Sequence, residues 1–272
     1  MTMADMEAGS KSLEEEVKEL REETARLRAR NEALAKEFRH AEELGERRLA
    51  AVQSANEELQ QFAYAASHDL QEPLRSIATY AQLLERRYAL DQEASEYTHF
   101  IVDGVNRMNV LIRDLLTYSR TGHSPKRTTV GLDSLVQWSM LNLQQAISDS
   151  GAEITYEGLP EISVDESQIV QLFQNLLSNA LKYRGSNTPK IRITAEEGTS
   201  CYTILVADNG QGIEPRFHKQ VFGVFKRLHG REVPGTGIGL ALCRKIVEGH
   251  GGQIWVESDG QGGSTFKFTL PF

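Results

Sequence analysis

Hydrophobic residues in the N-terminal part of the chain recur with alternating spacings of four and three. The series runs from Leu13 to Ala41, and Glu, Lys and Arg occupy most positions between. This heptad pattern is typical of a two-stranded coil, so we expect a parallel coiled-coil signalling helix over residues 13–55. Asn31 falls at an a position, where its amide can pair with the same amide of a second chain and fix the register. Residues 1–12 lack this period, and we expect a disordered start there.

The same charge-rich segment would also suit a single solvated helix. The hydrophobic series changes phase at residues 44–49 and then continues to Ala66 without a glycine or proline. A phase change locally unwinds or overwinds a supercoil. The continuity favours a coiled coil that is mechanically connected to the next segment.

A second long amphipathic helix is predicted from about Glu93 to Arg120. A short connection at residues 89–92 makes it the second arm of an antiparallel hairpin, which is too thin to bury both apolar stripes. A second copy of the chain would complete a four-helix bundle, so we assign residues 56–121 to a dimerisation domain. The turn-like segment 122–128 is predicted to be a linker. The stripe of the second helix consists of Tyr97, Phe100, Ile101, Val105, Met108, Leu111, Ile112, Leu115 and Leu116.

Residues 129–272 alternate between helical and strand-like periodicity. A glycine-rich turn at residues 259–263 joins the last two predicted strands, which indicates antiparallel pairing and an α+β sandwich. We expect Trp138 and Trp255 to pack between its layers. The predicted helices are 132–149, 165–183 and 238–249, and the predicted strands are 153–156, 162–164, 190–196, 201–207, 253–258 and 264–270.

Composition excludes several classes of function. The formal net charge of -8 argues against nucleic-acid binding, which needs clustered Lys and Arg. Cys201 and Cys243 have no metal-type spacing and are predicted to be buried thiols. No segment approaches the roughly 20 apolar residues of a membrane span, and the start has no apolar signal-peptide segment, so we expect a cytoplasmic protein.

The run from Ser67 to Arg75 places a histidine beside an acid on a predicted helix. A neutral imidazole, with an ordinary pKa of about 6.5, can attack phosphorus at physiological pH. We predict that His68 attacks through one ring nitrogen while the Asp69 carboxylate orients the ring. Adjacent helical residues do not face each other squarely, so this contact needs a suitable rotamer. Pro73 lacks an N–H group and can bend the helix beside this site.

Asn175 and Asn179 are four residues apart on a predicted helix, and Lys182 follows three residues later. This spacing places them on one face of the helix. Neutral amide oxygens suit Mg²⁺, which shares phosphate oxygens and retains several waters. An asparagine pair alone would equally fit a solvated helix surface.

Two glycine-rich segments lie downstream. Asp208 ends an apolar strand, and a flexible turn follows it. The second segment leads into the last predicted helix, so backbone N–H groups and the positive helix end can meet phosphate oxygens. It lacks the Lys-Ser/Thr of a P-loop. Phe225 and Arg227 lie between the segments as an aromatic anchor and a cation, and residues 228–234 are predicted to form a mobile lid. The glycines are Gly210, Gly212, Gly235, Gly237 and Gly239.

Together, the His68 run and the three downstream segments resemble the sensor histidine kinases of two-component systems. The resemblance covers residues from about 56 to 272, and the His68 run looks especially like the kinase modules linked to phytochromes and PAS-type sensors. It implies a dimerisation and histidine phosphotransfer domain at 56–121 and a catalytic ATP-binding domain at 129–272. It also implies that ATP, with Mg²⁺, phosphorylates His68, which then passes the phosphoryl group to an Asp of a response regulator receiver domain.

The resemblance also gives roles to individual residues. It assigns Asn175 to the metal, Asn179 and Lys182 to the phosphates, and Tyr183 to the nucleoside. It assigns Asp208 to the adenine amino group, with the glycines, Phe225 and Arg227 around the nucleotide. Glu72 stands where many relatives have Thr or Asn, so phosphatase activity is not implied.

Two other functions compete with the kinase. An ATPase clamp of the same nucleotide-binding superfamily would need a catalytic Glu near Asn175, and residues 171–174 supply none. A non-catalytic dimeric scaffold would not need His68 or a full set of ATP motifs. The completeness of the motifs therefore favours a homodimeric kinase, and we expect its upstream sensor domain to lie outside this chain.

Overall fold

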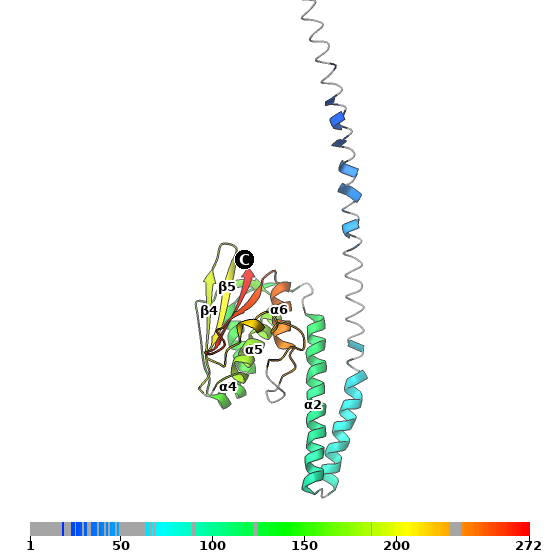
Figure 1. Cartoon of the computed structure of the whole chain (residues 1–272), viewed down its shortest axis with the longest axis vertical. Helices are drawn as coiled ribbons and strands as arrows, with labels where there is room; N and C mark the ends of the chain where they lie inside the picture. Colours follow the sequence, from blue (N-terminus) through cyan, green and yellow to red (C-terminus); the bar gives the residue numbers. More distant parts are fainter. Residues whose placement is uncertain are drawn as a thin grey trace, which may run out of the picture. The chain divides into compact units, whose positions relative to one another are not determined.

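The computed structural model describes residues 64, 65, 67, 69–88, 91–121, 125–185, 187–228 and 235–272, with scattered positions between Lys18 and Arg48 (Figure 1). The chain separates into two compact units, residues 1–61 and 62–272. Every described residue of the first unit is helical and exposed. Helical structure there agrees with the heptad pattern, while pairing into a coiled coil stays a prediction.

The second unit begins with an antiparallel helical hairpin. Residues 69–87 form its first helix, and Asp91 caps the second, α2 (Gln92–Arg120), by accepting a 2.8 Å hydrogen bond from the Ala94 N–H. The Arg120 guanidinium lies 4.7 Å from the centre of the Tyr64 ring, so the end of α2 lies beside the start of the first helix. The predicted hairpin is therefore present.

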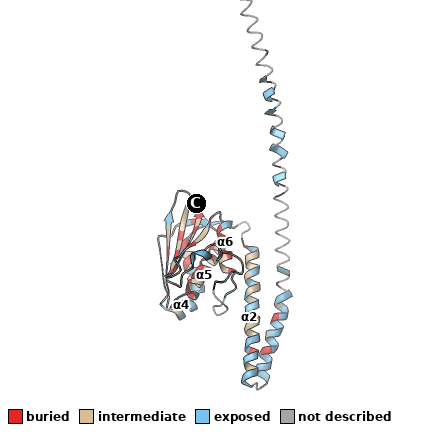
Figure 2. Cartoon of the chain, viewed as in Figure 1, coloured by how far each residue is buried: buried red, intermediate tan, exposed pale blue. Residues whose placement is uncertain are grey.

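The hairpin buries few apolar side chains and exposes a line of apolar side chains on each helix. Leu74 and Ala81 are buried on the first helix, and Val105 is buried on α2. A hairpin of only two helices leaves one apolar line of each helix in water (Figure 2). The exposed lines have a spacing of seven residues and consist of Leu70, Ile77 and Leu84 on the first helix and Ile101, Met108 and Leu115 on α2.

A two-layer α/β sandwich follows the hairpin. Its main sheet has the order β2-β4-β5-β7-β6, in which only the β2–β4 pair is parallel, and β1 and β3 form a small antiparallel sheet. The strands are β1 (Thr128–Gly131), β2 (Glu153–Glu157), β3 (Glu161–Val164), β4 (Lys190–Glu197), β5 (Cys201–Asp208), β6 (Ile254–Glu257) and β7 (Ser264–Pro271). The helices are α3 (Leu132–Asn142), α4 (Gln144–Ser150), α5 (Glu166–Lys182) and α6 (Gly239–Gly249), with a short 3₁₀ helix η1 (Pro215–Phe217).

The core lies between the helices and one face of the main sheet. Burial alternates along β7, so that Phe266, Phe268 and Leu270 are buried. This is the pattern expected of a strand with one covered face. Phe173 of α5 meets Phe268 edge to face at a centroid distance of 5.9 Å. These contacts fix α5 over the sheet and thereby position the polar residues of its other face.

Four details differ from the sequence predictions. Cys201, which was expected to be buried, is only half-buried. The helix expected over 132–149 is broken at Leu143 into α3 and α4. Strand β1 was not predicted, and it begins at Thr128, the last residue of the expected linker, because residues 128–131 pair with β3. Trp138 is 49% exposed, and Trp255 pairs with Lys267 on the sheet face opposite the core, so neither tryptophan packs between the layers. Among the described helices, none combines the length and apolar character needed to cross a membrane.

Candidate functional site

A pocket opens between the C-terminal end of α5, the turn after β5 and strand β7. It brings together five residues that the sequence singled out in three separate segments: Asn179, Tyr183, Asp208, Gly212 and Arg227. Apolar side chains form much of the remaining wall, which suits a flat aromatic ligand with a few polar anchors. The rest of the lining consists of Ala180, Gln211, Ile213, Val221, Lys226, Leu228, Leu240, Ser264 and Phe266.

Asp208 is the anionic group of this pocket. It is the last residue of β5 that pairs with β4, opposite Ile191. Its Oδ1 accepts hydrogen bonds from the Gly210 N–H at 2.8 Å and the Ser264 N–H at 3.3 Å. Burial raises the pKa of the Asp208 carboxyl, and these two bonds oppose the rise. Both bonds fall on Oδ1, which leaves Oδ2 as the oxygen suited to accept a hydrogen bond from a ligand.

The turn after Asp208 lies against the end of α5. The Gln211 N–H donates to the Tyr183 carbonyl at 3.0 Å. A Cβ atom at Gly210 would lie 2.7 Å from that same carbonyl oxygen, so a side chain there would push the turn away. Gly212 has a φ of 78°, in the left-handed region that favours glycine. The glycines therefore keep Asp208 and Tyr183 on the same pocket.

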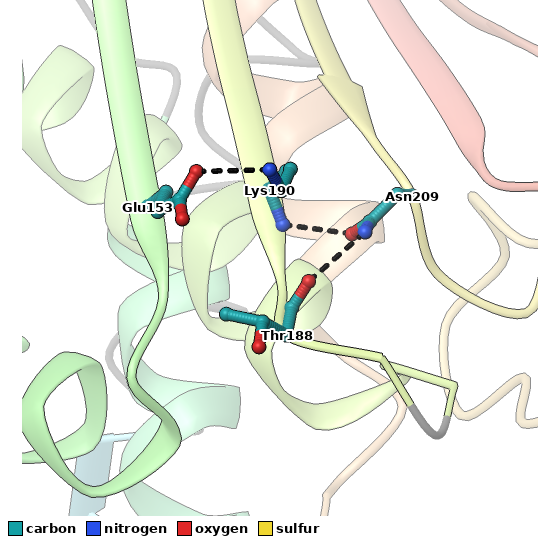
Figure 3. Close-up of polar contacts among 4 residues, drawn as sticks. All are labelled: Glu153, Thr188, Lys190 and Asn209. Carbon is teal, nitrogen blue, oxygen red and sulfur yellow. Dashed lines mark hydrogen bonds and ion pairs between the residues drawn. The ribbon is translucent and has the colours of Figure 1, made fainter.

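Asn209 makes a contact that the sequence motif did not predict (Figure 3). Its Oδ1 accepts a 2.7 Å hydrogen bond from the Lys190 N–H, and its Nδ2 donates at 3.0 Å to the Thr188 carbonyl. The Lys190 side chain points elsewhere and pairs with Glu153 at 3.1 Å. The side chain of Asn209 thus joins the turn after β5 to the start of β4.

Asn175 lies one turn before Asn179 on α5. Its Nδ2 donates to the Gln171 carbonyl at 3.0 Å, and within the described part of the chain Oδ1 of this half-buried side chain accepts no hydrogen bond. A Cβ atom at Gly239 would lie 3.0 Å from this Oδ1, so the start of α6 approaches Asn175 closely. The described residues contain no cluster of three or more His, Cys, Asp or Glu that could hold a metal. A Mg²⁺ ion would therefore depend on the amide oxygen, water and ligand phosphates, a set that this cation accepts.

Lys182 and the second glycine segment both interact with the hairpin residue Asp114. Burial lowers the pKa of the Lys182 ammonium, and the charge of Asp114 partly offsets that change. The Thr236 hydroxyl donates a 2.6 Å hydrogen bond to Asp114 Oδ2. A Cβ atom at Gly235 would lie more than 4 Å from the described atoms around it, and Gly237 has a φ of 75°. Lys182 does not line the described pocket.

The segment before the glycine loop contributes cations rather than an aromatic wall. Lys226 and Arg227 line the pocket, whereas Phe225 does not and is 58% exposed. The buried aromatic anchor is Phe222, whose ring meets Phe266 at a centroid distance of 6.3 Å. The residues expected to form a lid lie outside the described part of the chain, apart from Leu228, which lines the pocket.

The phosphoacceptor candidate, His68, lies outside the described residues. Its neighbour Asp69 is helical and exposed. Sequence reasoning missed Ser264 and Phe266, which enter the pocket from β7. Nothing in their local sequence marks them, since their position depends on pairing of β7 with β5.

Two family comparisons match the two parts of this architecture. Residues 58–124 match the His Kinase A (phospho-acceptor) domain, and residues 164–272 match the histidine kinase-, DNA gyrase B- and HSP90-like ATPase domain. The hairpin is thus a phosphoacceptor-type domain, and the sandwich is an ATPase-type domain. The chain thus contains the phosphoacceptor domain and the ATPase domain of histidine kinases, in this order.

Curated relatives agree with this assignment. The chain is 45% identical over 239 residues to the phytochrome-like protein Cph1 of Synechocystis sp., covering 86% of this chain and 32% of that protein. It is 32% identical over 231 residues to the methanogenesis regulatory histidine kinase FilI of Methanothrix harundinacea, covering 82% of this chain and 26% of FilI. The chain thus spans about a third of the length of the first of these relatives.

Solved structures share the fold. Full-length ShkA in complex with AMPPNP gives a TM-score of 0.62 at 24% identity, covering 78% of this chain and 46% of that one. Histidine kinase ThkA, in complex with response regulator protein TrrA, gives a TM-score of 0.54 at 22% identity, covering 78% of this chain and 61% of that one. At these identities the likeness concerns the fold alone.

Proposed function

We propose that this chain is an ATP-dependent protein histidine kinase that phosphorylates its own His68 and passes the phosphoryl group to an Asp of a response regulator. The observation that carries the proposal is the pocket, in which a half-buried carboxylate, two cations and the end of α5 converge. The match of residues 58–124 to a phosphoacceptor domain supplies the second half of the reaction.

The pocket residues suit the two ends of ATP. Asp208 offers an acceptor oxygen within an apolar wall, which suits the amino group of adenine. Lys226 and Arg227 lie at the same pocket and offset phosphate charge. Catalysis then consists mostly of positioning and charge neutralisation, as is general for phosphoryl transfer.

The transfer forms one bond and breaks one. A ring nitrogen of His68 bonds to the γ-phosphorus while the bond between that phosphorus and the bridging oxygen of ADP breaks. The imidazole gains positive charge, and the Asp69 carboxylate stabilises it and orients the ring. Mg²⁺, held through Asn175, supplies further neutralisation of phosphate charge when bound.

Dimerisation is proposed from the exposed apolar lines of the hairpin. Ile77, Leu84 and Ile101 are each 46 to 49% exposed in the single chain. Because each CH₂ group removed from water contributes about 0.8 kcal/mol, leaving two such lines in water is costly. A second copy would cover them in a four-helix bundle. The exposed Leu27 and Leu34, seven residues apart in the first unit, fit the same parallel dimer.

A receiver domain is the proposed second partner. ThkA, which shares the fold, was solved in complex with a response regulator. A phosphoryl group on imidazole must be passed to another acceptor for signalling, and a carboxylate of a separate protein fulfils this role in the proposed reaction.

Incubation with γ-labelled ATP and Mg²⁺ tests the proposal. We expect protein-bound label that is stable to alkali and labile to acid, the behaviour of a phosphorus–nitrogen bond. His68→Gln should abolish the label and retain ATP binding. His99→Gln provides the control, since His99 is an exposed histidine of the same hairpin. Full labelling of the His68 variant would refute the assignment of the acceptor, and an unlabelled wild-type chain would refute the kinase.

A further inference from the structure

The side chain of Asn209 makes hydrogen bonds to backbone groups at the point where the pairing of β4 with β5 ends. The last paired residues are Ile191 and Asp208, so the next rung would join the backbones of Lys190 and Asn209. Instead, Asn209 Oδ1 accepts the hydrogen bond of the Lys190 N–H at 2.7 Å (Figure 3). The Asn209 Nδ2 group donates to the Thr188 carbonyl at 3.0 Å.

A carboxamide is the side chain that can replace a peptide group in this way. It carries one acceptor oxygen and a donor NH₂, as a peptide carries C=O and N–H. The backbone partners fix its orientation, because the Lys190 N–H can only donate and the Thr188 carbonyl can only accept. Asp would keep the first bond and place a carboxylate oxygen against the Thr188 carbonyl, and Ala would lose both bonds.

Because the Asn209 side chain binds the Lys190 N–H in place of a backbone carbonyl, the backbone after β5 can turn toward α5. Immediately after Asn209, the Gly210 N–H donates to Asp208 Oδ1, and the Gln211 N–H donates to the Tyr183 carbonyl. If the backbone of Asn209 continued the ladder with β4, Gly210 would be carried along the sheet and away from these partners. The amide of Asn209 thus secures the turn against β4 while the backbone leaves the sheet.

We propose that Asn209 is a positioning residue for nucleotide binding, which acts by holding the turn that orients the Asp208 carboxylate. This inference deepens the proposed function and depends on ATP binding in the Asp208 pocket. Asn209 itself does not line that pocket, so its effect on ATP must pass through its neighbours.

Calorimetric titration with ATP and Mg²⁺ tests the inference on the full chain. We expect Asn209→Ala to weaken ATP binding about fivefold, the factor that corresponds to one net hydrogen bond. Asn209→Asp should weaken it at least as much. The matched control is Lys190→Ala, which removes the ion pair with Glu153 and keeps the backbone N–H that Asn209 binds. Its affinity should equal that of the wild type.

Two further measurements separate positioning from loss of folded protein. The ATP concentration for half-maximal autophosphorylation should rise in Asn209→Ala, while the rate at saturating ATP stays near the wild-type value. A merely destabilised domain would instead lower the saturating rate in proportion to the folded fraction. In a double-mutant cycle, Asn209→Ala should add little to the effect of Asp208→Asn on ATP affinity, because both changes act on the contact between the Asp208 side chain and ATP.

The outcomes distinguish this inference from the function on which it depends. If the wild-type chain fails to bind ATP, the proposed function and the inference both fall. If the wild type binds ATP and Asn209→Ala binds equally well, the inference alone is overturned. Additive effects in the double-mutant cycle would also overturn it, since Asn209 would then act independently of Asp208.

Discussion

Replacing Asp208 with Asn should weaken ATP binding without lowering the stability of the fold. The Asn side chain has nearly the same shape, and its single oxygen can keep the bonds from the Gly210 and Ser264 N–H groups, which both fall on Oδ1 in the wild type. The NH₂ group then occupies the place of Oδ2. A donor would face the amino group of adenine where the wild type presents an acceptor.

The size of the loss follows from the type of hydrogen bond removed. A bond to a charged acceptor contributes about 1.5 to 3 kcal/mol, which corresponds to a roughly 10- to 150-fold change in the dissociation constant. The free energy of unfolding should rise in Asp208→Asn. Burial raises the pKa of Asp208 in the folded state, so its ionisation opposes folding at neutral pH, and that penalty disappears as the pH falls through the raised pKa. An uncharged Asn avoids the penalty.

Calorimetric titration with ATP at pH 7.5, paired with urea unfolding, measures both quantities. Asp259→Asn is a suitable control, because Asp259 Oδ1 also accepts two backbone bonds, from Gln261 at 2.8 Å and Gly262 at 3.2 Å, and does not line the pocket. The control should bind ATP like the wild type. Wild-type affinity in Asp208→Asn would refute the adenine contact, and a large loss of stability would refute the argument from burial.

Two further predictions concern charges around the sandwich. Asp114→Asn should bind ATP about threefold more tightly in a calorimetric titration at low salt, because it removes a negative charge near Lys182. The control, Asp103→Asn on the same helix, should bind ATP like the wild type. Equal affinities of the wild type and both variants would contradict this prediction. Burial lowers the pKa of His250, so the unfolded chain takes up a proton at a pH where the folded chain does not. Stability should therefore fall as the pH drops below about 6.5, and urea unfolding at pH 7.5 and 5.5 should show a loss about 1 kcal/mol larger in the wild type than in His250→Phe. Parallel losses in the two proteins would exclude His250 as the source.

Local periodicity was enough to predict most elements of the fold. The polar face of α5, with Asn175 and Asn179 four residues apart, and the alternation along β7 both follow from which side of an element is covered. Periodicity did not predict the helix break at Leu143 or strand β1. The pairing of β1 with β3 and the helix break at Leu143 depend on partners elsewhere in the chain, which a short window does not contain.

The candidate site divides in the same way. The sequence by itself determined the chemistry, since residue type and spacing singled out Asn179, Tyr183 and Asp208, and their motifs carried the resemblance to histidine kinases. Only the tertiary structure decided which groups surround them. The Ser264 N–H binds the Asp208 carboxylate, 56 residues away in the sequence, because β7 pairs with β5. The Asn209 side chain binds the Lys190 N–H because β4 lies on the other side of β5. Such contacts depend on strand order and register, which arise from burial of the whole sheet and leave no mark in the local sequence.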